Sequence, residues 1–229
     1  MELLLNSNKN NFNPLIGIFH VMAFLGLFLL EQIPLGLLTL TKKDLGHNYA
    51  SYLKIVPIIT IILLVIVAFI IWLVFKKAQS FKTVPFKKST WIIVGIAVIL
   101  IFAINAVTVP LMNKTNANVD ALQLVAKNNI AILVFFTIIV APILEEILFR
   151  GIFMNWFFAN TPIVSVILSG MFFGYAHAPI GAHTDWIYLL SKVMLGIVLA
   201  AVYARTKNIK ANITVHFLNN FLAIIVGAF

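Results

Sequence analysis

Cysteine is absent from this 229-residue sequence, so the chain can form no disulfide, no thiolate metal site and no cysteine nucleophile. Acidic residues are scarce as well: seven Asp and Glu stand against 16 Lys and Arg, and only 10% of the chain is charged. A soluble globular domain has about a quarter of its residues charged. The chain therefore lacks the charged surface of an ordinary soluble protein.

Long apolar runs take the place of the missing charge, and 62% of the residues are hydrophobic. The hydrocarbon core of a bilayer requires about 20 apolar residues per helix, and on that rule we expect an all-α, polytopic membrane bundle of about seven transmembrane helices. The expected spans are residues 14–36, 55–75, 91–111, 130–150 with a continuation to about 158, 162–180, 186–204 and 211–229.

Basic residues gather in two short loops, at 76–88 and 205–210. Such loops usually face the cytoplasm, which predicts a cytoplasmic N-terminus and an outward C-terminus. The short, cysteine-free chain is typical of a bacterial protein, so we expect it in the bacterial plasma membrane. Because this placement accounts for the net charge of +9, we expect the lipid bilayer, and no nucleic acid, as partner. The sequence specifies no oligomeric state.

Polar residues at membrane depth divide the chain at about residue 129. We expect residues 1–129 to be N-terminal scaffold helices and residues 130–229 to be the functional core. Two isolated charges receive structural interpretations. Glu31 precedes a proline and is expected at the outer interface, where the first span ends or bends. Lys192 is expected to extend its ammonium group to the outer surface.

Two glutamates and an arginine stand together in the apolar stretch PILEEILFRG, residues 142–151. Glu146 and Arg150 are four residues apart, so on a helix they share one face and can form an ion pair. Pairing lowers the cost of keeping both charges in a low-dielectric site. Glu145 is about 100° further round the helix. We therefore expect Glu146 and Arg150 to support the structure, and Glu145 to point into a cavity as a candidate general base.

Imidazoles and an amide occur at membrane depth in two later spans. His177 ends the stretch FGYAH, while His216 and Asn220 share a helix face in HFLNN. Such groups usually face a bundle interior or a water-filled cavity. Together with Glu145 they could activate a water and stabilise an oxyanion. Two alternatives stay open: the imidazoles and amides join helices by hydrogen bonds, or Glu145, His177 and His216 bind a catalytic zinc. The sequence has no HExxH motif, which weakens the zinc alternative.

The three motifs together resemble the CPBP family, which comprises CAAX prenyl proteases and bacteriocin-processing or self-immunity proteins and is also called the Abi family. EEILFR matches the EExxxR motif of that family, FGYAH matches its FxxxH motif, and HFLNN matches its HxxxN motif. The motifs follow one another in the family order, and the resemblance covers about residues 130–229.

The resemblance implies a CAAX-protease-like fold and a glutamate-dependent intramembrane peptidase that needs no metal cofactor. The implied site residues are Glu145 and His177 for water activation, His216 and Asn220 for the oxyanion hole, and Glu146 and Arg150 in support. The implied substrate is a peptide or a membrane protein. A non-catalytic alternative is a bacteriocin self-immunity or scaffold protein that binds its partner without cleaving it.

Depth along the helices is the one feature that disagrees with this site. If the helices start at the cytoplasmic face, Glu145 and His177 lie about 20 and about 22 Å from that face. His216 lies only about 8–14 Å from it, and a tilt or a kink around Gly170, Gly174 and Pro179 could close the gap.

Overall fold

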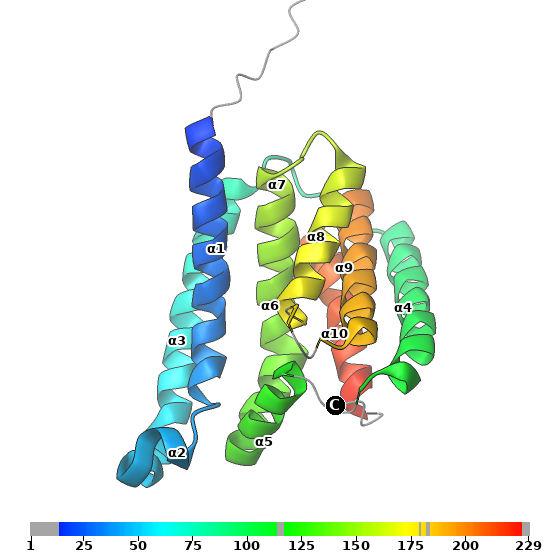
Figure 1. Cartoon of the computed structure of the whole chain (residues 1–229). Helices are drawn as coiled ribbons and strands as arrows, with labels where there is room; N and C mark the ends of the chain where they lie inside the picture. Colours follow the sequence, from blue (N-terminus) through cyan, green and yellow to red (C-terminus); the bar gives the residue numbers. More distant parts are fainter. Residues whose placement is uncertain (1–13, 114–116, 179, 182–183, 226–229) are drawn as a thin grey trace, which may run out of the picture.

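The computed structural model describes residues 14–113, 117–178, 180–181 and 184–225, and these residues form helices joined by turns, with no strand among them. The N-terminal part contains α1 (Pro14–Leu37), the short α2 (Lys42–Leu45), α3 (Tyr49–Ala78) and α4 (Lys88–Thr108). The C-terminal part contains α8 (Pro162–His177), α9 (Trp186–Thr206) and α10 (Ile209–Ile225). A long helical segment that carries α5, α6 and α7 stands between α1 and α3 on one side and α8, α9 and α10 on the other, while α4 packs against α9 and α10 (Figure 1). The prediction of an all-α membrane bundle is confirmed.

Five helical segments are long and apolar enough to cross a membrane, and they overlap five of the seven expected spans. The expected spans at 162–180 and 211–229 are shorter helices in the described part of the chain, with 16 and 17 residues. Helices of that length measure about 24–26 Å, slightly less than the bilayer core of about 30 Å. The span expected to reach residue 180 ends at His177, because the residue before Pro179 disfavours helical backbone angles. Residues 226–229 lie outside the described residues.

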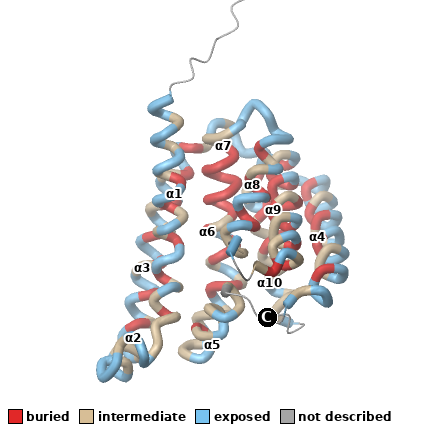
Figure 2. Tube along the Cα trace, viewed as in Figure 1, coloured by how far each residue is buried: buried red, intermediate tan, exposed pale blue. Residues whose placement is uncertain are grey.

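Apolar side chains cover the outer faces of α1, α3 and α4. Phe19, Ile62 and Ile99 are 66%, 54% and 71% exposed, and exposed residues follow the outside of these helices in Figure 2. Hydrocarbon is the solvent that suits such a surface, and a helix satisfies its own backbone hydrogen bonds there. The protein is therefore an integral membrane protein.

Helices α8 and α9 pack closely through glycines. A Cβ atom added to Gly170 would lie 2.7 Å from the backbone nitrogen of Ile197, and one added to Gly196 would lie 2.8 Å from the Cα atom of Gly170. Small residues allow membrane helices to approach at this distance. The contact sets α8, which ends at His177, directly against α9.

The long central segment contains α5 (Ala117–Phe135), α6 (Ala141–Glu146) and α7 (Met154–Trp156), with π-helical turns at Phe136–Val140 and Ile147–Phe153. It is interrupted at Asn129, where φ is −162° and ψ is 86°. The Oδ1 atom of Asn129 accepts a hydrogen bond from the backbone nitrogen of Ile132 at 3.1 Å and so caps the helix that follows. The span expected from residue 130 begins at this break.

The two basic loops contact one another at one end of the bundle. The backbone nitrogen of Val84 donates to the carbonyl oxygen of Lys207 at 3.3 Å, and Asn208 Nδ2 donates to the carbonyl oxygen of Val84 at 2.7 Å. This contact agrees with the expectation that both loops lie on the same side of the membrane. Which side they face stays a prediction.

Candidate active site

Glu146 and Arg150 form the ion pair that their spacing predicts. Arg150 Nη1 donates to Glu146 Oε1 at 2.9 Å, and both side chains are fully buried. Arg150 Nη2 donates to the carbonyl oxygen of Gly196 in α9 at 2.8 Å. From α10, Asn212 Nδ2 donates to Glu146 Oε2 at 3.3 Å. The pair thus connects the central segment to α9 and α10.

His216 stands between the two glutamates and is only 2% exposed. Its Nδ1 lies 2.9 Å from Glu146 Oε1, and its Nε2 lies 3.8 Å from Glu145 Oε2. A carboxylate paired with Arg150 can only accept hydrogen bonds, so we assign the proton of the neutral imidazole to Nδ1. Nε2 then presents a lone pair towards Glu145, and Glu146 determines how His216 is oriented.

Glu145 points away from the ion pair and towards His177. Its Oε2 lies 3.6 Å from His177 Nε2 and is buried without a hydrogen-bond partner among the described residues. His177 Nδ1 lies 2.9 Å from the carbonyl oxygen of Phe173, which can only accept, so Nδ1 carries the proton and Nε2 faces Glu145 with a lone pair. Three acceptor atoms therefore converge: Glu145 Oε2 and the Nε2 atoms of His177 and His216.

His216 reaches the other two residues, so the gap in depth that the rise per residue suggests is closed. The gap follows from placing the start of α10 at the membrane surface. In the structure the start of α10 is covered, because Asn208 and Ala211 are only 4% and 0% exposed. Asn208 also binds the loop that contains Val84. Neighbouring segments therefore cover α10 from its first turn, and the contact of 3.8 Å between His216 Nε2 and Glu145 Oε2 shows that the two side chains lie at one level.

Asn220 is positioned by the backbone carbonyl group of Thr137. Pro142 has no N–H, so this carbonyl lacks a hydrogen-bond donor within its own helix. Asn220 Nδ2 donates to the carbonyl oxygen of Thr137 at 2.9 Å. Within the helix, this carbonyl could bind the N–H of residue 141 or 142. The N–H of Ala141 binds the carbonyl oxygen of Phe136, and Pro142 has no N–H. The Thr137 carbonyl is therefore available to Asn220.

Glu145, His177, His216 and Asn220 line a single cavity of about 120 Å³. The structure thus brings together the four residues that the motifs single out as catalytic. They come from three helical segments, namely α6, the last turn of α8, and α10.

Glu31 and Lys192 also line this cavity, and the interpretation of Glu31 as interfacial is wrong. Glu31 is 4% exposed and accepts a hydrogen bond from Gln32, and α1 continues beyond it to Leu37. Helix α1 packs against the central segment, and this packing turns Glu31 inwards. Lys192 is half-buried, and its side chain lines the cavity. Position along a single helix could not reveal either contact.

Asn212 is a site residue that the motif analysis missed. It is fully buried, and its Nδ2 lies close to Glu146 Oε2 and to the carbonyl oxygen of Leu199. A signal was present in the sequence, because Asn212, His216 and Asn220 recur at intervals of four and therefore share one helix face.

The donor atoms do not form a ready metal site. Among the described residues, no group of three His, Asp or Glu side chains is arranged to hold a metal ion. At the site itself, Glu145 Oε2 lies 3.6 Å from His177 Nε2 and 3.8 Å from His216 Nε2. We therefore derive no catalytic step through a metal.

Comparison with known proteins adds a family match over the same part of the chain. Residues 127–222 match the family described as type II CAAX prenyl endopeptidase Rce1-like. Over 224 residues the chain is 27% identical to the UPF0177 protein YvdC of Lactococcus lactis, covering 93% of this chain and 80% of YvdC. The matched range agrees with the region in which the three motifs lie.

Two further relatives carry peptidase names. Over 120 residues the chain is 34% identical to YdiL of Bacillus subtilis, whose name describes it provisionally as a membrane peptidase. Over 147 residues it is 24% identical to the membrane-embedded CAAX protease MroQ of Staphylococcus aureus. These matches cover 49% and 59% of this chain, but only 42% of YdiL and 56% of MroQ. No solved structure matches the chain.

Proposed function

Since residues 127–222 match the Rce1-like family of type II CAAX prenyl endopeptidases, we propose that this chain is an intramembrane peptidase of that kind. Its substrate is a membrane-associated peptide or protein, and the reaction is hydrolysis of one peptide bond. The observation that carries the proposal is the convergence of Glu145 Oε2 with the Nε2 atoms of His177 and His216 at 3.6 and 3.8 Å.

Three acceptors at these separations call for a hydrogen-bond donor between them, and a water molecule can donate two hydrogen bonds. In the proposed geometry the water donates one O–H to Glu145 and the other to His177 Nε2. Its oxygen lone pair then faces the cavity, where a substrate carbonyl would lie. The buried oxygen of Glu145 and the cavity of about 120 Å³ support this arrangement.

In the proposed reaction the water oxygen adds to the carbonyl carbon of the scissile bond, and Glu145 takes the proton that the water loses. The carbonyl oxygen becomes an oxyanion. When the bond to nitrogen breaks, the proton moves from Glu145 to the departing amine. The products are a carboxylic acid and an amine, and Glu145 returns to its ionised state.

The oxyanion is stabilised in this proposal by Asn220 and His216. The Asn220 Oδ1 accepts a hydrogen bond from Asn219 at 2.9 Å, and one Nδ2 hydrogen binds Thr137, so the amide is fixed and its second N–H can point at the oxyanion. His216 becomes a second donor once its Nε2 takes a proton from bulk water before the substrate binds, and the Glu146 carboxylate at Nδ1 supports that imidazolium.

We place the protein in a bacterial plasma membrane with its N-terminus in the cytoplasm. The three relatives named above come from bacteria, and the two basic loops lie at one end of the bundle. Basic loops of membrane proteins concentrate on the cytoplasmic side.

The test compares peptide termini in membranes of cells that express the wild-type protein or the Glu145→Gln variant. We expect a set of new termini that only the wild-type protein generates, because removal of a general base costs about 10²- to 10⁴-fold in rate. The matched control is Asp44→Asn, which makes the same chemical change at an exposed carboxylate in α2. The control should generate the wild-type termini.

Two outcomes would contradict the proposal. Identical termini for wild type and Glu145→Gln would contradict a peptidase activity that depends on Glu145. Protection from a bacteriocin by the Glu145→Gln protein would favour an immunity function based on binding. A second arm treats wild-type membranes with EDTA, and we expect the termini to form as before. Loss of cleavage that zinc restores would instead favour the metal-dependent alternative.

A further inference from the structure

Lys192 is a membrane-embedded cation without a carboxylate partner. Among the described residues, no Asp or Glu lies within ion-pair distance of its ammonium group. The ammonium nitrogen lies over the ring face of Tyr188, 5.1 Å from the ring centroid. An ionisable residue at membrane depth usually serves a binding or transport site, because its burial is costly. Lys192 is therefore a candidate ligand-binding residue.

A second cavity adjoins the catalytic one and has a volume of about 370 Å³. This is within the range of roughly 300–1,000 Å³ that ligand pockets have. The two cavities share five lining residues: Asn118, Leu122, Lys192, Leu195 and Asn220. The larger cavity is therefore a direct neighbour of the space beside Glu145.

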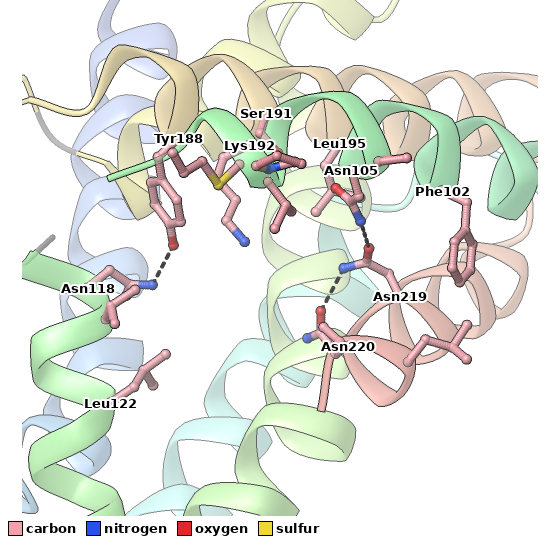
Figure 3. Close-up of a pocket in the computed structure, with 17 residues that line it drawn as sticks. Phe102, Asn105, Asn118, Leu122, Tyr188, Ser191, Lys192, Leu195, Asn219 and Asn220 are labelled. Atoms are coloured by element: carbon pink, nitrogen blue, oxygen red, sulfur yellow. Dashed lines mark hydrogen bonds between the residues drawn. The ribbon is translucent and has the colours of Figure 1, made fainter. Parts of the chain in front are cut away.

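The larger cavity is mostly apolar, and Lys192 is the charged residue among those described in its lining. Figure 3 shows the ammonium group of Lys192 pointing into the middle of this space, between Tyr188 on one side and Asn220 on the other. On the far side of the cavity, Asn105 donates to Asn219 at 3.1 Å, and Asn219 donates to Asn220. One cation and a chain of amides thus lie on an apolar wall, close to the catalytic residues.

From this geometry we propose that Lys192 forms a carboxylate-binding subsite for the substrate. The apolar wall accommodates aliphatic side chains, and the ammonium group binds an anionic carboxylate on the same peptide. The carboxylate is either a free C-terminus or an acidic side chain close to the cleaved bond. The inference rests on the proposed peptidase function, and it adds which chemical group positions the substrate.

The charge of Lys192 also acts on Glu145, His177 and His216. A substrate carboxylate bound to Lys192 would therefore lie within the electrostatic environment of the catalytic residues. Lys192 is a specificity-determining residue in this proposal and takes no part in the proton transfers.

The test measures binding and not cleavage, so that it gives an answer even if the peptidase proposal fails. The protein is the full chain with Glu145→Gln, reconstituted in lipid nanodiscs so that no peptide is consumed. The probe is a fluorescent peptide rich in leucine and alanine, in three forms. One form has a free C-terminal carboxylate, one has a C-terminal amide, and one has a C-terminal amide with a penultimate glutamate.

We expect one of the two anionic forms to bind roughly 10- to 100-fold more tightly than the neutral amide, since hydrogen bonds to charged groups have this strength. Lys192→Gln should abolish the difference, and Lys192→Arg should retain most of it. Preference for the free C-terminus identifies a terminal carboxylate as the ligand, whereas preference for the glutamate form identifies an acidic side chain. The control Lys54→Gln removes a lysine from the exposed side of α3 and should leave the preference unchanged.

Equal binding of all three forms, or no binding of any form, would overturn the subsite. A carboxylate preference that survives Lys192→Gln would overturn it as well. A Lys192-dependent preference in a protein that generates no new termini would support the subsite and contradict the peptidase function, so the two failures can be told apart.

Discussion

Glu145 and Glu146 are neighbours in the chain, yet they have different partners. Glu146 is fully buried and contacts Arg150, His216 and Asn212 through its two oxygens. Glu145 Oε2 has no hydrogen-bond partner among the described residues and lines the catalytic cavity. The rotation of about 100° between successive helix residues predicts this division. The contact with His216 could not be predicted, because it joins two helices.

Substitution of Glu146 should therefore destabilise the protein far more than substitution of Glu145. Glu146→Gln leaves the buried Arg150 without its counter-charge, and breaking a buried pair costs about 3–5 kcal/mol.

Arg150→Lys should also destabilise the protein, since one ammonium group cannot reproduce the guanidinium fork that binds both Glu146 and the Gly196 carbonyl. Thermal unfolding in detergent measures both effects. Glu145→Gln is the control, and a loss of Tm as large as that of Glu146→Gln would contradict the division of roles.

The central helical segment shows how one element positions a residue on another. The π-helical turn at Phe136–Val140 and Pro142 leave the Thr137 carbonyl without a helical donor, and Asn220 of α10 takes its place. Both π-helical turns flank the glutamate pair, and such turns are frequent at functional sites. The helical character of the segment follows from its apolar composition. The π-helical turns depend on packing, and no residue pattern predicted them.

Pro142→Ala should lower activity without lowering stability. The new N–H can bind the Thr137 carbonyl and so competes with Asn220. Asn220 then loses the hydrogen bond that positions it, and we expect kcat to fall roughly tenfold. KM should change little, because the substrate cavity is intact. Tm should stay equal or rise, since proline inside a helix is unfavourable.

The matched control for this variant is Pro57→Ala, which removes a proline from the interior of α3, away from the catalytic cavity. It should leave kcat unchanged. If Pro142→Ala has full kcat, the Thr137 carbonyl does not position Asn220 for catalysis.

The arrangement of the whole molecule places the two basic loops together at one end and α2 at the other (Figure 1). Apolar side chains cover the outer helices between these ends, as a bilayer requires. The chain contains no cysteine, so a single introduced cysteine reports its own location without interference.

We expect a cysteine at position 43 to react with a membrane-impermeant maleimide in intact cells. A cysteine at position 82 should react only after the membrane is opened. Lys43→Cys and Lys82→Cys both replace exposed lysines, so they form a matched pair. The reverse labelling pattern would place the basic loops outside and contradict the predicted cytoplasmic N-terminus.

The sequence by itself determined the class of the protein and the local geometry of its motifs. Apolar runs predict membrane helices, and a spacing of four predicts the pair of Glu146 and Arg150, because both follow from the dimensions of a single helix. The split between residues 1–129 and 130–229 stays a prediction. The family match begins close to that boundary, at residue 127.

Only the tertiary structure decided which distant residues meet. Glu31 and Lys192 face the catalytic cavity, His216 comes level with Glu145, and Asn220 binds a carbonyl that Pro142 leaves available. These contacts depend on how deeply each helix sits and which face it turns to its neighbours. Apolar surfaces pack without direction. The polar side chains and the close glycine contacts between α8 and α9 therefore select the arrangement that creates the site.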